Sequence, residues 1–147
     1  MQIWIDADAC PRAVKDVVFR VSARLHIPVY VVANRALATP VIGDVRIVQV
    51  PAGSDVADRY IVEHVAAGDL VITADIPLAA LVVDRGAVGL DPRGDLYTAD
   101  TVGDRLATRN LLEELRWAGV DAGGPAAYRA KDQQRFAQAF HQLLAQR

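Results

Sequence analysis

The sequence predicts an α/β protein, a single-domain three-layer sandwich with a mostly parallel five-stranded sheet between two layers of helices. Two observations lead to this prediction. Short apolar runs alternate with segments of helical periodicity along the whole chain. Several of the runs are apolar at consecutive positions, which is typical of strands buried on both faces. Helices between successive strands act as crossover connections, and such connections make neighbouring strands parallel.

The elements follow in order along the chain. Ile3–Ile5 is the first strand, and Pro11 opens a helical pattern to about Leu25, because proline is tolerated in the first turn of a helix. Further strands are expected at 29–33, at 45–50 with the alternation of an edge strand, at 69–73, and weakly at 87–90. Further helices are expected at about 56–67, 76–83 and 101–117, with a C-terminal helix at about 128–146.

Composition narrows the class of protein. The 147 residues suit one domain spanning 1–147. A net charge of −2 excludes a uniformly basic nucleic-acid binder, although a local basic groove is compatible with it. No apolar run is long enough to span a bilayer, no signal-peptide pattern is present, and the single cysteine, Cys10, excludes an internal disulfide. We therefore expect a cytoplasmic protein with no membrane partner; a homo-oligomer is compatible with this composition.

Aspartates gather at one predicted edge of the sheet. Asp6 and Asp8 follow the first strand and Asp75 follows the fourth. Asp55 and Asp58 lie in the first turn of the helix after the third strand, and Asp91 follows the fifth strand. The carboxyl ends of parallel strands share one edge, and ligands of open α/β sheets bind there. We therefore place the candidate site at this edge.

Each aspartate also has a purely structural interpretation, because aspartate is a favoured helix cap. We prefer that interpretation for Asp55. We reject it for Asp6 and Asp75, since a charge directly after a buried strand is costly unless something binds it. Several carboxylates without histidine or cysteine favour a hard divalent cation, Mg²⁺ or Mn²⁺. Such an ion could activate water and stabilise the attacking and leaving oxygens of a phosphodiester.

Two families match the pattern only in part. The run Ile3–Asp8 resembles the first motif of haloacid-dehalogenase phosphatases, and 71–73 resembles their second, but neither Lys15 nor Lys131 lies where that mechanism requires a lysine. Response-regulator receiver domains need a lysine after the fifth strand, where this chain has Leu90-Asp91-Pro92.

PIN-domain nucleases are a closer match. Their acidic positions resemble Asp6, the Ala57–Ile61 stretch that contains Asp58, and Thr73-Ala74-Asp75. More specifically, the chain resembles the YaiI/YqxD family, which is bacterial, functionally uncharacterised and grouped with the PIN-like folds. The stretches that carry this resemblance are 6–11, 53–58, 68–79 and 92–94. PIN nucleases usually carry a further acid in the helix after the second strand. No clear equivalent occurs between Val32 and Val45, so either Asp8 replaces it or the site is a weaker one.

These observations give a set of assignments. Asp6, Asp58 and Asp75 are expected to be metal ligands and, with Asp8 as a ligand or water-orienting base, catalytic residues of an RNA-directed phosphodiesterase. Substrate binding is assigned to Asn34, Thr73, Arg93, Arg105 and Arg109. A solvated salt bridge between Arg109 and Glu113 is an equally weighted alternative for that arginine. Two other functions stay open: a phosphomonoesterase with Asp6 as nucleophile and Asp8 as acid/base, and a non-catalytic module that binds RNA or a nucleotide.

Overall fold

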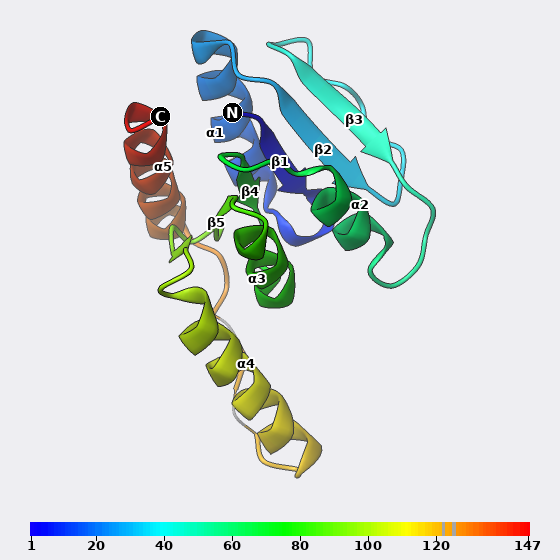
Figure 1. The fold of residues 1–147 in the computed structure, drawn as a ribbon, viewed down its shortest axis with the longest axis vertical. Coiled ribbons are helices and arrows are strands. Elements are labelled where there is room, and N and C mark those ends of the chain that lie inside the picture. The colour runs from blue at the N-terminus through cyan, green and yellow to red at the C-terminus, as the bar shows by residue number, and fades with distance from the viewer. Residues whose placement is uncertain (122, 125) are drawn as a thin grey trace.

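The computed structural model describes residues 1–121, 123–124 and 126–147, and it has the predicted α/β architecture (Figure 1). The strands are β1 (Ile3–Asp6), β2 (Val29–Ala33), β3 (Val45–Gln49), β4 (Leu70–Ile72), β5 (Val88–Leu90) and β6 (Leu96–Tyr97). The helices are a short 3₁₀ turn η1 (Ala7–Ala9), α1 (Arg12–Leu25), α2 (Val56–His64), α3 (Ile76–Asp84), α4 (Val102–Trp117) and α5 (Ala130–Ala145).

One sheet joins all these strands in the order β3-β2-β1-β4-β5-β6. The first five strands are parallel, with β1 and β4 as central neighbours and β3 at an edge, as its alternating pattern predicts. The carboxyl ends of β1 and β4 therefore lie side by side, and this arrangement brings Asp6 close to the residues that follow β4.

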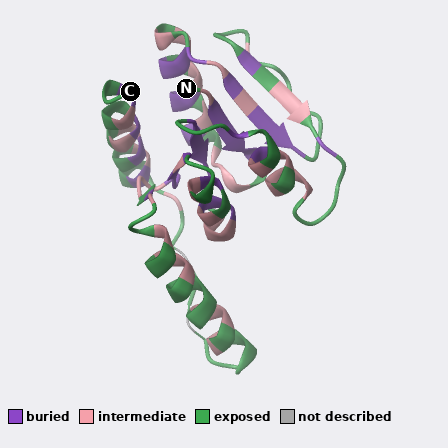
Figure 2. Cartoon of the chain, in the orientation of Figure 1, coloured by how far each residue is buried: buried purple, intermediate pink, exposed green. Residues whose placement is uncertain are grey.

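Alternating side chains of β1 face the two helical layers. Ile3 and Ile5 pack with α1 and α5, whose buried residues include Val18 and Phe136. Trp4 faces the other way, into a second cluster formed with α2 and α3, where it is a core residue that is 3% exposed. Figure 2 shows the buried residues concentrated on the strands and on the inner sides of the packed helices.

The prediction of five strands is wrong by one. β6 pairs antiparallel with β5, with Leu96 opposite Leu90. Between these strands the chain turns at residues 91–95, where the Asp91 N–H donates to the Asp95 carbonyl oxygen over 2.8 Å. Gly94 has a φ of +95° in this turn, a conformation that glycine adopts readily. Two strand residues are too few to show alternation, so periodicity could not reveal β6.

Two segments depart from a regular layered arrangement. The chain between β2 and β3 crosses from one end of the sheet to the other without a helix. Helix α4 has no buried residue and extends away from the sheet in Figures 1 and 2. In the described part of the chain, no helix combines the length and apolar character needed to cross a bilayer.

Candidate active site

The site is built around a contact between the ends of β1 and β4. Asp6 is the last residue of β1 and is 5% exposed. Thr73 follows β4 and is fully buried. Its hydroxyl donates to Asp6 Oδ2 over 3.0 Å and accepts the Asp75 N–H over 3.0 Å. One hydroxyl therefore holds the Asp6 carboxylate and fixes the backbone at Asp75. The structure therefore indicates that Thr73 positions Asp6. The predicted contact of Thr73 with substrate would need an exposed hydroxyl, and this hydroxyl is buried.

Asp75 has the capping role that was rejected for it from the sequence. It is the N-cap of α3, and its Oδ1 accepts the Leu78 N–H over 3.1 Å. The sequence argument assumed that a charge after a buried strand lacks a partner. The following helix supplies one immediately, through its free N–H groups. One carboxylate oxygen of Asp75 is therefore used by the fold.

Asp58 lies near Asp6 and Asp75 but belongs to a different helix. It lies in the first turn of α2, which packs beside α3 on the Trp4 face of the sheet. Burial, followed by the charges of Asp75 and Asp6, raises the pKa of Asp58 to about 7. Burial likewise raises the pKa of Asp6, and the charges of Asp75 and Asp8 add to this effect while the Thr73 hydrogen bond opposes it. Asp6, Asp58 and Asp75 thus form one electrostatically coupled group.

The other candidate acids differ in position. Asp8 lies in η1, exposed at the rim beside Asp6. Asp55 is exposed and has a φ of 64°. Asp55 is the N-cap residue of α2, as predicted, although its side chain makes no hydrogen bond to the helix. Asp91 is buried in a separate network, where it accepts hydrogen bonds from the Arg93 N–H and the Tyr97 hydroxyl.

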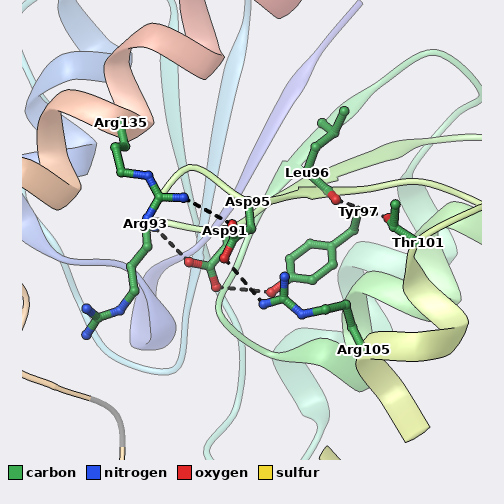
Figure 3. Close-up of polar contacts among 8 residues, drawn as sticks. All are labelled: Asp91, Arg93, Asp95, Leu96, Tyr97, Thr101, Arg105 and Arg135. Atoms are coloured by element: carbon green, nitrogen blue, oxygen red, sulfur yellow. Dashed lines mark hydrogen bonds and ion pairs between the residues drawn. The ribbon is translucent and has the colours of Figure 1, made fainter. Parts of the chain in front are cut away.

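The arginines predicted to bind substrate already have partners in the protein. Arg93 Nη1 contacts Asp132 Oδ2 at 3.1 Å, and its other terminal nitrogen donates to the Ala126 carbonyl oxygen. Arg105 contacts Asp95 at 3.4 Å and lies over the Tyr97 ring (Figure 3). Arg93 thus ties the turn after β5 to the segment before α5, while Arg105 ties the start of α4 to the same turn.

The remaining predicted contacts lie on the surface. Arg109 pairs with Glu113 at 2.7 Å, and both side chains are 42% exposed, which matches the alternative interpretation of this arginine as part of a solvated pair. Asn34 is exposed directly after β2. Its assignment to substrate binding stays a prediction, as do those of Arg93, Arg105 and Arg109, each of which would have to exchange a protein partner for substrate.

The donor set fits an open site for a hard cation better than a closed cage. Within residues 1–121, 123–124 and 126–147, no three Asp, Glu, His or Cys side chains are arranged closely enough to hold a metal ion between them. Mg²⁺, however, is commonly held by only one or two carboxylates, with water and substrate phosphate as the other ligands. Asp6 and Asp75, linked through Thr73, provide oxygen donors of that kind, and Asp58 lies close by.

Cys10 is not a candidate nucleophile. Burial raises the pKa of its thiol to about 12; Lys15 opposes this shift, while Asp6 and Asp91 add to it. The thiol is therefore protonated at neutral pH.

Two buried acids went unnoticed in the sequence. Asp69 accepts hydrogen bonds from Trp4 Nε1 and from the Gln2 and Ala66 N–H groups, which ties β1 to the segment before β4. Asp132 accepts the Arg129 N–H at the start of α5 in addition to its contact with Arg93. An acid three residues after the N-cap residue of a helix is a capping signal that could have indicated Asp132. No comparable signal marks Asp69.

The fold and the site define an α/β protein with a coupled acidic group at the carboxyl edge of a mostly parallel sheet. Residues 4–146 match the family described as "Uncharacterized BCR, YaiI/YqxD family", and the chain belongs to that family. The UPF0178 protein of Citrifermentans bemidjiense is 58% identical over 98% of this chain and 94% of its own length. The UPF0178 protein of Bordetella petrii is 54% identical over 98% of this chain and 96% of its own length.

Among solved structures, Rae1 (YacP) from Bacillus subtilis aligns over the whole of both chains with 13% identity and a TM-score of 0.37. A similarity this low carries no argument about function.

Proposed function

We propose that the protein is a PIN-like, divalent-metal-dependent phosphodiesterase that acts on single-stranded RNA. The observation that supports this most directly is the link between Asp6 and Asp75 through the Thr73 hydroxyl at the carboxyl ends of two central strands. Asp58 adds a third carboxylate whose pKa is raised by both of those charges. A group of like charges at a ligand-binding edge is costly to assemble, and a bound cation would relieve that cost.

In this proposal the chain's own residues have distinct roles. Asp6 is held in a fixed orientation by Thr73 and is the central ligand. Asp75 offers the carboxylate oxygen that the α3 cap leaves free, and Asp58 of α2 lies close by as a third carboxylate. When bound, Mg²⁺ or Mn²⁺ would supply a more acidic water and neutralise charge on the phosphodiester. Asp8, exposed at the rim, would orient or deprotonate the attacking water.

The test is cleavage of a labelled single-stranded RNA in the presence of Mn²⁺ or Mg²⁺. We expect Asp6→Asn and Asp75→Asn to lower the rate at least 100-fold. Asp100→Asn, an exposed carboxylate outside the site, should leave the rate unchanged and serves as the matched control. Cys10→Ser should also retain activity, because the thiol has no chemical role in this scheme.

Three results would contradict the proposal. Full cleavage in excess chelator would exclude the metal-dependent mechanism. A covalent phosphate on Asp6, formed from a phosphate monoester, would support the phosphomonoesterase alternative. RNA binding without turnover under any metal would identify the non-catalytic module.

A further inference from the structure

A groove of about 1180 Å³ lies on the α1 face of the sheet, next to the acidic group. One wall is α1, the other is the chain that follows β2, and the floor includes Val31 of β2 and Ile47 of β3. The groove exists because β2 and β3 are joined without a helix, so this end of the sheet lacks the usual helical cover. Gly43 brings the connecting chain back against α1, where a Cβ would lie 2.9 Å from the Cβ of Ala23.

Basic side chains outnumber acidic ones along this groove. Arg12, Lys15, Arg20 and Arg35 line it, together with only two acids, Asp8 and Asp16. Over the ranges that the structure describes, no ion pair engages Arg12, Lys15 or Arg35, in contrast to Arg93, Arg105 and Arg109. In a chain with a net charge of −2, this local excess of positive charge favours an anionic occupant.

The groove also has an apolar part. Phe19, Leu37 and Ile47 line it and are partly buried against the core. A phosphate chain alone would leave these side chains without a partner, whereas a nucleobase can stack on an aromatic ring or an aliphatic surface. The bases of a duplex are already stacked with each other. Cations beside an apolar floor therefore fit a single strand better than a duplex.

The groove lies near the candidate active site in the chain, although Asp6, Asp58 and Asp75 do not line it. Ala7 and Asp8 line its end, and they directly follow Asp6 in the chain. Asp8 is also one of the charges that raise the pKa of Asp6. A strand lying in the groove would thus pass beside Asp8.

We propose that this groove binds a single-stranded polynucleotide, with Arg12, Lys15 and Arg35 on its phosphates and Phe19 and Leu37 against a base. This assignment rests on the proposed function for the identity of the reaction. Strand binding can nevertheless be measured without any turnover, so the two proposals can fail separately.

The experiment compares two triple variants of the full chain by fluorescence anisotropy, with a labelled oligouridylate in EDTA. The groove variant carries Arg12→Gln, Lys15→Gln and Arg35→Gln. The control carries Arg24→Gln, Lys131→Gln and Arg147→Gln, which remove the same residue types and the same charge from exposed positions outside the groove. Thermal melts of both variants verify that they are folded.

We expect the groove variant to raise the Kd at least tenfold and the control to bind like wild type. Each lost phosphate contact should also lower the slope of log K against log salt by about 0.7 for a single strand, so the groove variant should lose about 2 from that slope. A duplex of the same length should bind wild type more weakly than the single strand does.

Three results would overturn the assignment: equal binding by both variants, no binding by wild type, or preferential binding of the duplex. Absence of RNA cleavage together with groove-dependent binding would instead refute the proposed catalytic activity and leave the binding site in place.

Discussion

The Thr73 hydroxyl donates a 3.0 Å hydrogen bond to Asp6 Oδ2, and this contact joins the carboxyl ends of β1 and β4 inside the protein. Asp6 is buried, so its charge depends on this donor, and Thr73 in turn accepts the Asp75 N–H. A single side chain therefore determines both the position of the central carboxylate and the start of α3. The first prediction concerns this contact.

Replacing Thr73 by valine keeps the shape but leaves the buried Asp6 carboxylate without its donor. We expect Thr73→Val to lower the free energy of unfolding at pH 7 by about 1–3 kcal/mol. The variant should raise the pKa of Asp6 further, so the loss should shrink as the pH falls and Asp6 becomes protonated. Thr73→Ser keeps the hydroxyl and should show a loss that does not vary with pH. Urea denaturation of both variants at several pH values measures this, and equal pH profiles would show that the hydrogen bond has no energetic role.

The raised pKa of Asp58 should make the stability of the metal-free protein depend on pH. Its pKa of about 7 in the folded state lies above the ordinary value of 3.8, so between those values the folded state binds more protons than the unfolded state. Stability should therefore fall as the pH rises from about 4 to about 7. Asp58→Asn should remove this fall and melt higher than wild type above pH 7, with no difference below pH 4. Thermal melts in EDTA provide the measurement, and a wild-type curve that rises over this window would contradict the assignment.

Asp75 should respond differently from Asp58, because it also caps α3. Asp75→Asn relieves the same repulsion but loses the favourable interaction of a charge with the helix N-terminus. Its gain in chelator should therefore be smaller than that of Asp58→Asn. Asp75→Ala loses the cap as well and should be less stable than Asp75→Asn by about 1 kcal/mol. If Asp75→Asn gains more than Asp58→Asn in the same melts, the cap contributes less than the repulsion.

The parts of the site that the sequence predicted depend on patterns among residues that are close together in the chain. Asp6 and Asp75 follow apolar runs, and the parallel arrangement of those runs brings their ends to one edge. Asp58 lies in the first turn of the helix after the third strand, and its assignment as a ligand came from the resemblance to PIN-domain nucleases. The cap at Asp75 was missed because the sequence argument counted the cost of burying its charge but not the free N–H groups of the next helix, which stabilise that charge.

The parts that were missed depend on contacts distant in sequence. The charge of Arg93 suggested a phosphate contact, but its partner, Asp132, lies 39 residues away, and no local pattern joins the two. The basic groove has a similar cause: Arg12 and Lys15 look like ordinary solvated residues of an amphipathic helix. Only the path of the chain between β2 and β3 places them beside Arg35.

Substitutions of Arg93 and Arg109 should differ in their effect on the stability of the protein, because Arg93 has a buried partner and Arg109 an exposed one. Arg93→Ala leaves Asp132, which is 5% exposed, without its cation and should destabilise the protein by about 1–3 kcal/mol. Arg109→Ala removes an exposed pair and should change stability by no more than about 0.5 kcal/mol. Urea denaturation of both variants measures this. A larger effect at Arg109 than at Arg93 would show that the structural and surface roles are reversed.

Substitution of Gly94 tests how tightly the turn after β5 packs on α5. A Cβ at this position would lie 2.8 Å from the backbone carbonyl of Arg135, and the φ of +95° disfavours any other residue. Gly68 has a similar φ of +87° but no atom within 4 Å of an added Cβ, so it isolates the conformational cost. We expect Gly68→Ala to cost roughly 1–2 kcal/mol and Gly94→Ala to cost clearly more, because the α5 backbone must shift. Gly103→Ala, in an open position of α4, should instead stabilise by about 0.5–1 kcal/mol. Equal losses for Gly94→Ala and Gly68→Ala in urea denaturation would mean that α5 does not pack against this turn.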